Sequence, residues 1–128
     1  MTFKKLLYNT ALLCCLVTHI VHAASQEVTT KGQLDNAIKS SKTVIVKFYS
    51  PECPHCRNFA PIFEEASNKN AGLPFISVNI LKYPTLSAPY KIGGLPTIIY
   101  FVNGTEVDRT MGSNAVEFKQ KLATFSKK

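Results

Sequence analysis

The chain of 128 residues contains no tryptophan, no internal repeat, no low-complexity tract and no segment with the composition of an interdomain linker. These absences argue against a repeat array and against a second domain. Its 15 lysines and arginines are scattered, without the basic run and interleaved aromatics of a nucleic-acid surface. The composition therefore predicts one domain with a soluble surface and no nucleic-acid partner.

No apolar run is long enough to favour a membrane span. The best candidate, residues 6–21, is interrupted by Asn9 and His19 and falls short of the roughly 20 apolar residues that a span needs. An uncleaved membrane anchor is therefore disfavoured. A lipoprotein signal at Cys14 or Cys15 is disfavoured too, because a bulky residue precedes each cysteine where such signals want a small one.

The same segment has the order of parts of a secretory signal. Lys4 and Lys5 give it a positive start, an apolar stretch follows, and a small residue, Ala23, stands where a signal peptidase would cut. We predict a signal peptide over residues 1–23 and a single domain over residues 24–128. The domain is expected to be exported, either to a bacterial periplasm or as a secreted protein.

Cysteine is scarce once the leader is removed, because only Cys53 and Cys56 remain, with His55 as the only histidine. In small exported domains, cysteines usually form disulfide bonds between positions far apart in the sequence. A bridge between Cys53 and Cys56 would close a very small loop and add little stability. The pair is therefore predicted to be chemically reactive rather than to form a structural disulfide.

Helical and strand-like patterns alternate along the rest of the chain. The first half is expected to form a helix capped by Thr30 and running to about Ser40, a buried strand at 44–49, and a helix from Cys53 to about Asn68 with Pro61 inside it. A strand at 73–80 and a short helix or turn to Lys91 should follow, and then a hairpin of strands 97–102 and 105–111 around Asn103-Gly104. The last expected element is a helix from Asn114 to about Ser126 that buries Val116, Phe118, Leu122 and Phe125. This order predicts an α/β fold, in which a central mixed sheet has helices on both faces.

The sequence Cys53-Pro54-His55-Cys56 stands at the expected start of a helix. Unpaired N–H groups and the helix dipole stabilise a thiolate there, which makes Cys53 the candidate nucleophile. Pro54 suits the first helical turn, where a missing N–H costs nothing. His55 would add a partial or full positive charge that lowers the pKa of Cys53, unless it is simply an exposed helix residue.

Cys56 lies one helical turn after Cys53 and closer to the body of the protein. It can therefore attack a mixed disulfide from within and release the substrate. A copper- or zinc-binding module is an alternative, but zinc wants four ligands and His55 cannot easily converge with both sulfurs. A redox-inert interaction domain is another. We expect no bound metal and no cofactor beyond a redox-active Cys53–Cys56 disulfide.

Residues 24–128 resemble the thioredoxin family, because its motifs occur in order and at the right spacing. They are the central strand that runs into Cys53, the Cys-x-x-Cys pair, Pro61, Gly94-Leu95-Pro96-Thr97, the Asn103-Gly104 turn and Gly112. The resemblance implies a thioredoxin fold, a cis peptide bond before Pro96, and the backbone of Leu95 beside the sulfurs. An extended substrate segment could pair with Leu95 as an added strand, so Leu95 and Pro96 are the expected substrate-binding residues.

Three positions depart from the family pattern. Lys47 stands where well-known members carry a buried acid; it could lower a thiol pKa as a cation or extend to water, and we favour extension to water. Glu52 occupies the position of an aromatic residue before the first cysteine and is expected to point to solvent. Without tryptophan, Tyr49 must supply the aromatic packing near the site.

The resemblance implies a protein thiol-disulfide oxidoreductase that acts on protein thiols and disulfides as a monomer. Cys-Pro-His-Cys resembles the motif of the bacterial periplasmic disulfide oxidase, although the chain has no room for that enzyme's helical insertion. The first hypothesis is therefore an oxidase or isomerase of exported proteins. The alternative is a reductase fed by a membrane electron donor, and the sequence leaves this direction open.

Overall fold

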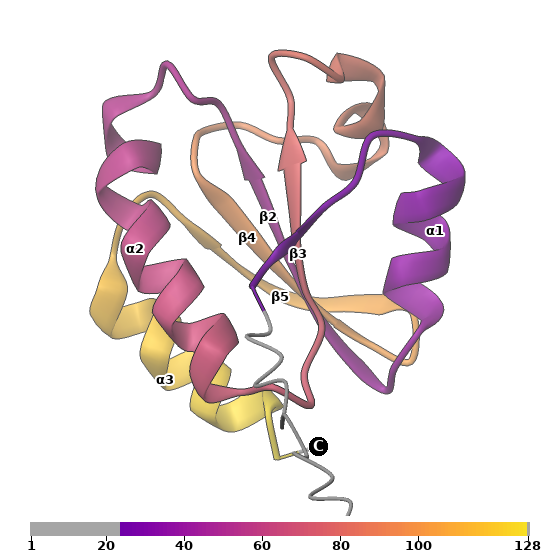
Figure 1. The fold of residues 1–128 in the computed structure, drawn as a ribbon, viewed down its shortest axis with the longest axis vertical. Coiled ribbons are helices and arrows are strands. Elements are labelled where there is room, and N and C mark those ends of the chain that lie inside the picture. Colours follow the sequence, from indigo (N-terminus) through magenta and orange to yellow (C-terminus); the bar gives the residue numbers. More distant parts are fainter. Residues whose placement is uncertain (1–23, 128) are drawn as a thin grey trace, which may run out of the picture.

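The computed structural model describes residues 24–127 (Figure 1), so the predicted signal peptide over residues 1–23 lies outside the described residues. The elements follow one another as β1 (Gln26–Glu27), α1 (Lys31–Lys39), β2 (Thr43–Tyr49), α2 (Pro54–Lys69), β3 (Phe75–Asn79), two 3₁₀ turns η1 (Pro84–Leu86) and η2 (Ala88–Tyr90), β4 (Thr97–Val102), β5 (Thr105–Met111) and α3 (Ala115–Phe125). No described helix is both long and apolar enough to cross a membrane.

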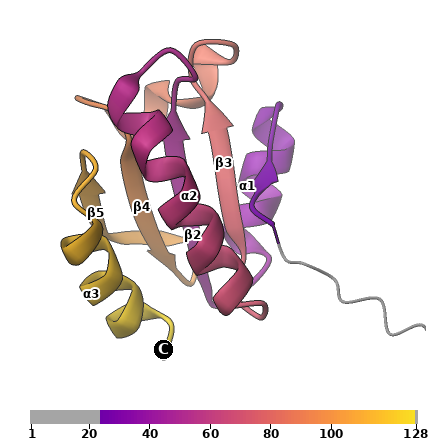
Figure 2. The same ribbon diagram turned by 60° about the vertical axis from the view of Figure 1, so that its left-hand side comes forward.

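The strands form a single five-stranded sheet in the order β1-β3-β2-β4-β5. β3 pairs in parallel with β1 and β2, whereas β4 pairs antiparallel with β2 and β5. Helix α1 lies on one side of this sheet and α2 on the other, together with α3 (Figure 2). The expected mixed sheet with helices on both faces is confirmed.

Each face of the sheet carries its own apolar core. The core under α1 contains Val28, Leu34, Ile38, Val44, Val46, Phe48, Ile76, Val78, Leu86, Ile99 and Phe101. The core under α2 and α3 contains Ile45, Phe59, Phe63, Phe75, Ile98, Tyr100, Phe118, Leu122 and Phe125. Because successive strand residues point to opposite faces, β2 supplies both cores and lies fixed between them.

Local sequence signals set most element boundaries correctly. Thr30 caps α1 by accepting the backbone N–H of Gln33, whose side chain accepts in return from the backbone N–H of Thr30. Asn103 and Gly104 have φ values of 51° and 78°, the positive φ that a two-residue hairpin requires. The hairpin strands occupy the predicted residues.

Three details of the prediction are wrong. The two-residue strand β1 was missed, because its two exposed residues carry no strand pattern and only pairing with β3 defines it. β3 is also shorter than the 73–80 expected. Val116 is 66% exposed rather than buried, because it lies only two positions before Phe118 and therefore projects from another face of α3.

Candidate active site

Cys53 lies at the point where the central strand gives way to a helix. β2 ends at Tyr49, the Cys53 N–H donates to the Ser50 carbonyl at 3.2 Å, and α2 begins at Pro54. Cys53 is the N-cap of α2, and its sulfur accepts the Cys56 N–H at 3.4 Å. Pro54 takes the first helical position, where its missing N–H leaves no hydrogen bond unmade. The predicted placement of both residues is confirmed.

The pKa of Cys53 lies below its ordinary value. A hydrogen bond from the Cys56 side chain is the main cause, and the backbone N–H groups of Cys56 and His55 add to it, with a favourable charge from Arg57. Burial raises the pKa and is second only to the Cys56 side-chain hydrogen bond, but the lowering effects together exceed it, and Cys53 remains partly exposed. A thiol with these properties forms a thiolate more readily than a free cysteine and stays accessible to a substrate.

Cys56 lies in the opposite environment. It is only 4% exposed, and the pKa of its thiol is raised to about 11, with burial as the largest cause. Its hydrogen bond to Cys53 raises the pKa further, whereas a backbone hydrogen bond from Ser50 and the charge of Lys47 lower it. The two sulfurs therefore differ in both exposure and acidity.

His55 and Arg57 both lower the pKa of Cys53, whereas we expected this effect from His55 alone. His55 is exposed, and its contribution to the lowered pKa of Cys53 comes from its backbone N–H, while the positive charge comes from Arg57. The Arg57 guanidinium also donates to the carbonyls of Pro51 at 3.2 Å and Glu52 at 3.1 Å, and so holds the loop before Cys53. The sequence signal for Arg57 was a cation four residues after the first cysteine.

The loop before β4 lies beside Cys53. The peptide bond between Leu95 and Pro96 is cis, as predicted, and the Leu95 carbonyl accepts the Cys53 thiol at 3.7 Å. Gly112, at φ 81°, donates its N–H to the Pro96 carbonyl at 2.8 Å. Backbone groups of Leu95 therefore lie directly beside the exposed sulfur, as the resemblance implied.

Lys47 is the main correction to the sequence analysis at this site. Instead of extending to water, it is only 5% exposed, with its Nζ 4.4 Å from the ring centroid of Phe63 and 5.0 Å from that of Tyr49. Helix α2 covers this face of the strand, so the side chain lies against the Phe63 ring rather than in solvent (Figure 2). Glu52 is exposed, as predicted.

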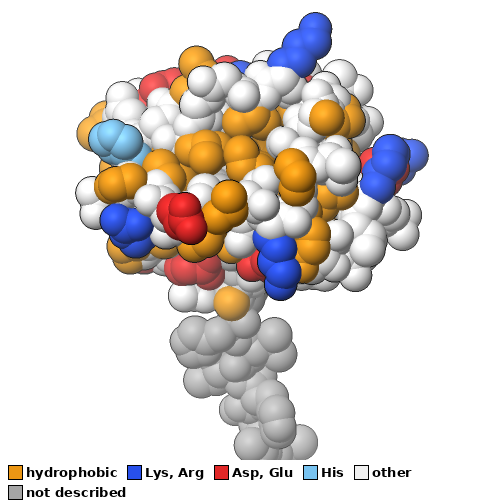
Figure 3. All heavy atoms as spheres, turned by 90° about the horizontal axis from the view of Figure 1, so that it is seen from above, with side chains coloured by type: hydrophobic (Ala, Val, Ile, Leu, Met, Phe, Trp, Pro, Cys, Tyr) orange, Lys and Arg blue, Asp and Glu red, His pale blue; other side chains and the backbone are white. Residues whose placement is uncertain are grey.

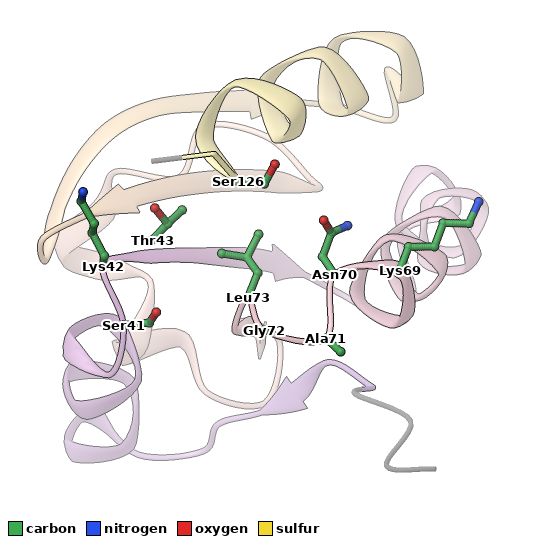
Figure 4. Close-up of a pocket in the computed structure, with 9 residues that line it drawn as sticks. All are labelled: Ser41, Lys42, Thr43, Lys69, Asn70, Ala71, Gly72, Leu73 and Ser126. Carbon is green, nitrogen blue, oxygen red and sulfur yellow. The ribbon is translucent and has the colours of Figure 1, made fainter.

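The end of the molecule that carries the start of α2 exposes several hydrophobic side chains, with polar side chains and backbone between them. Seen from above, hydrophobic side chains gather in its centre, and charged side chains lie mainly toward its rim (Figure 3). A hollow of about 480 Å³ lies elsewhere, lined by residues such as Lys42, Thr43 and Leu73 (Figure 4). Because Thr43 begins β2 while Cys53 follows its end, this hollow is remote from the cysteines.

Within residues 24–127, no group of three or more histidine, cysteine, aspartate or glutamate side chains could hold a metal ion. The cysteine pair itself supplies two thiols, one of them buried. The described residues therefore offer redox chemistry at sulfur rather than a complete ligand set.

Comparison with known proteins gives one family. The thioredoxin family model matches residues 25–126. A rice protein, thioredoxin H5, is 34% identical over 99 residues, which cover 74% of this chain and 73% of the relative. Another rice protein, protein disulfide isomerase-like 5-3, is 37% identical over 83 residues, covering 62% of this chain but only 20% of the relative.

Solved structures agree with this assignment. The structure of Plasmodium falciparum thioredoxin superimposes with a TM-score of 0.75 at 29% identity, covering 78% of this chain and 98% of that protein. The chain therefore belongs to the thioredoxin family, has the thioredoxin fold and is a thiol-disulfide oxidoreductase.

Proposed function

We propose that this protein exchanges disulfides with exported protein substrates, with Cys53 as nucleophile and Cys56 as resolving thiol. The Cys53 thiolate attacks a substrate disulfide and forms a mixed disulfide, releasing one substrate sulfur as a thiolate. Cys56 then attacks the Cys53 sulfur, forms the Cys53–Cys56 disulfide and releases the second substrate sulfur. The same steps in reverse oxidise a substrate dithiol.

The observation that carries this proposal is the contrast between the two thiols. Cys53 is partly exposed and its pKa is lowered, whereas Cys56 is buried and its pKa is raised to about 11. Only an exposed thiolate can meet a macromolecular substrate, and only a thiol held behind it can act on the mixed disulfide without competing for substrate.

Substrate chains are proposed to bind along the backbone of Leu95, beside the thiol of Cys53. Main-chain pairing of this kind accepts extended segments with little demand on sequence. The protein would then act as a monomer, with no cofactor besides its own redox-active disulfide. His55 and Pro54 complete the proposed site, Pro54 by starting the helix and His55 through its backbone N–H.

The direction of exchange is proposed to be oxidation or isomerisation, because a lowered pKa of Cys53 stabilises the reduced site and makes its disulfide more oxidising. Reduction with electrons from a membrane donor is the second candidate, favoured by the likeness to proteins named thioredoxin. A reduction potential of about −120 to −180 mV would indicate an oxidant or isomerase, and one of about −270 mV a reductant. The proposed location, a periplasm or the cell exterior, rests on the signal-like order of residues 1–23.

Trapping of mixed disulfides tests the proposed roles. Cys56→Ala should accumulate disulfide-linked partners that disappear on reduction, because Cys53 can still attack but nothing resolves the product. Cys53→Ser is the matched control and should trap nothing. A Cys53→Ser variant with undiminished exchange activity would contradict the assignment of the nucleophile.

A further inference from the structure

Lys47 is the only buried charged side chain among residues 24–127, and the roles proposed above do not use it. It lies in the middle of β2, on the face of the sheet that α2 covers, with Ile45 and Tyr49 on either side. Its neighbours across the sheet are Ser77 of β3 and Ile98 of β4, neither of which is charged. A lysine is costly at such a place unless its charge meets a compensating group.

Aromatic rings are the immediate surroundings of the Lys47 amine. Its Nζ lies 4.4 Å from the ring centroid of Phe63 and 5.0 Å from that of Tyr49, and both rings stabilise a cation through their negative faces. The ion pairs of the described residues are formed by other cations, namely Lys31, Lys69, Arg109 and Lys121. Among the described residues, the amine therefore contacts π faces and no carboxylate.

Two carboxylates face Lys47 from a greater distance, and both are engaged by other donors. Glu64 of α2 accepts the backbone N–H of Ser25 at 3.0 Å and the hydroxyl of the same serine. Glu27 of β1 accepts the Tyr49 hydroxyl at 2.9 Å. Their charges raise the pKa of Lys47, but burial has the larger effect and leaves that pKa below its ordinary value.

Cys56 is the remaining ionisable group that faces Lys47. Cys56 and Phe63 are seven residues apart on α2, which is about two helical turns, so the face of the helix that covers Lys47 also carries the buried thiol. The interaction is mutual: the charge of Lys47 lowers the pKa of Cys56, and a Cys56 thiolate raises the pKa of Lys47.

We propose that the Lys47 ammonium is the buried counter-charge of the Cys56 thiolate during exchange, and therefore a positioning residue for the resolving step. The inference rests on the proposed function. In that step the Cys56 thiol gives its proton to solvent, and its thiolate attacks the Cys53 sulfur of the mixed disulfide. A Cys53–Cys56 bond forms, the bond to the substrate sulfur breaks, and the electron pair leaves on that sulfur as a thiolate.

The same role holds when the enzyme oxidises a substrate. The substrate thiolate then attacks the Cys53 sulfur of the enzyme disulfide, and Cys56 is the leaving group. A leaving thiolate beside an ammonium is a better leaving group than one beside an apolar side chain. Lys47 therefore assists disulfide exchange in both the reducing and the oxidising direction.

Stopped-flow reaction with a nitrobenzoate disulfide separates the two steps, because each step releases one coloured thiolate. The first release reports attack by Cys53 and the second reports attack by Cys56. Lys47→Met keeps the length and apolar packing of the side chain without its charge. We expect it to slow the second release by about threefold or more, because fewer Cys56 thiols are ionised without the nearby charge, and to leave the first within about twofold.

Lys82→Met is the matched control. The Lys82 amine also lies over an aromatic ring, 5.4 Å from the ring centroid of Tyr83, but the side chain is exposed and away from α2. We expect both releases to keep their wild-type rates in this variant. Equal slowing by Lys82→Met and Lys47→Met would overturn the proposal, because the effect would then not be specific to the buried charge.

The pH profile and the arginine variant separate a charge effect from a packing effect. The advantage of wild type over Lys47→Met should shrink as pH rises through the lowered pKa of Lys47, where the ammonium becomes neutral. Lys47→Arg should retain fast resolution and keep its advantage at high pH. A slowing that is the same at every pH and is shared by both variants would make Lys47 merely structural. Absence of the first release in wild type would overturn the proposed function instead.

Discussion

The two faces of the sheet carry cores of different chemistry. The core under α1 consists of aliphatic and phenylalanine side chains. The face under α2 and α3 buries Lys47 beside Phe63 and places the Tyr100 hydroxyl 3.2 Å from the Thr110 hydroxyl. The half-buried Tyr83 and Tyr90 pack against the core under α1. The buried titratable groups, Lys47, Cys56 and Tyr100, belong to the face under α2 and α3. One face mainly stabilises the fold, and the other also sets the acidity of the sulfurs.

Removal of one large ring from each face sharpens this comparison and should have the largest effect. Phe63→Ala and Phe48→Ala each delete a fully buried ring, and each should lower the free energy of unfolding by about 3–5 kcal/mol, measured by urea denaturation. Only Phe63→Ala should also change the rate of the resolving step, because its ring contacts Lys47. Equal changes in resolution by both variants would remove the distinction between the faces.

Replacement of Tyr100, which is buried on the face under α2 and α3, should cost less unfolding free energy. Tyr100→Phe leaves the buried Thr110 hydroxyl without this partner and should cost about 1–2 kcal/mol of unfolding free energy. Burial raises the pKa of Tyr100 to about 12 from an ordinary 10.0. Its unfolded state therefore ionises first, so stability is complete below pH 10 and falls as pH rises toward 12.

The alkaline loss of stability should be smaller in Tyr100→Phe than in wild type. Thermal unfolding at a series of pH values measures it. Identical alkaline slopes in the two proteins would show that Tyr100 ionises as easily in the folded state as in the unfolded one, contrary to its buried position.

Arg57→Met should act on the site with little effect on the core. It removes a charge that lowers the pKa of Cys53 and two hydrogen bonds to the loop carbonyls of Pro51 and Glu52. We expect the pKa of Cys53 to rise only slightly, since charge effects at exposed positions are screened. The pH dependence of Cys53 alkylation measures it, with Lys69→Met at the far end of α2 as control. A fall in this pKa would contradict the account.

The smallest effect is expected at Val116. Its side chain is 66% exposed on α3, whereas Leu122 of the same helix is buried. Val116→Ser should change the free energy of unfolding by no more than about 0.5 kcal/mol. Leu122→Ala should cost about 2–5 kcal/mol. A large loss at Val116 in denaturant titration would restore the sequence-based expectation that it is buried.

Local signals explain what the sequence could predict. The cap at Thr30, the Asn103-Gly104 turn and the cysteine at the start of α2 each depend on residues near in sequence, and each was placed correctly. β1 depends on pairing with β3, more than 45 residues away, and was missed. Arg57 was not singled out, because only its contact with the loop carbonyls shows that it folds back toward Cys53.

Lys47 shows most clearly what could not be predicted from the sequence. A lysine between apolar residues is ordinarily expected to carry its amine to water along a flexible stem. Its burial depends on helix α2 lying over β2, which brings the Phe63 ring against the Lys47 amine beside that of Tyr49. That arrangement is a property of the tertiary structure, so the identity of residue 47 alone could not decide it.

Cys53 and Cys56 should differ in exposure and acidity, and the pH dependence of alkylation at each cysteine measures this difference directly. Mass mapping of the reduced protein after timed alkylation gives a profile for each sulfur. We expect rapid labelling of Cys53 with a pKa below its ordinary value, and slow labelling of Cys56 with a pKa of about 11. Equal profiles, or a more acidic Cys56, would contradict this expectation.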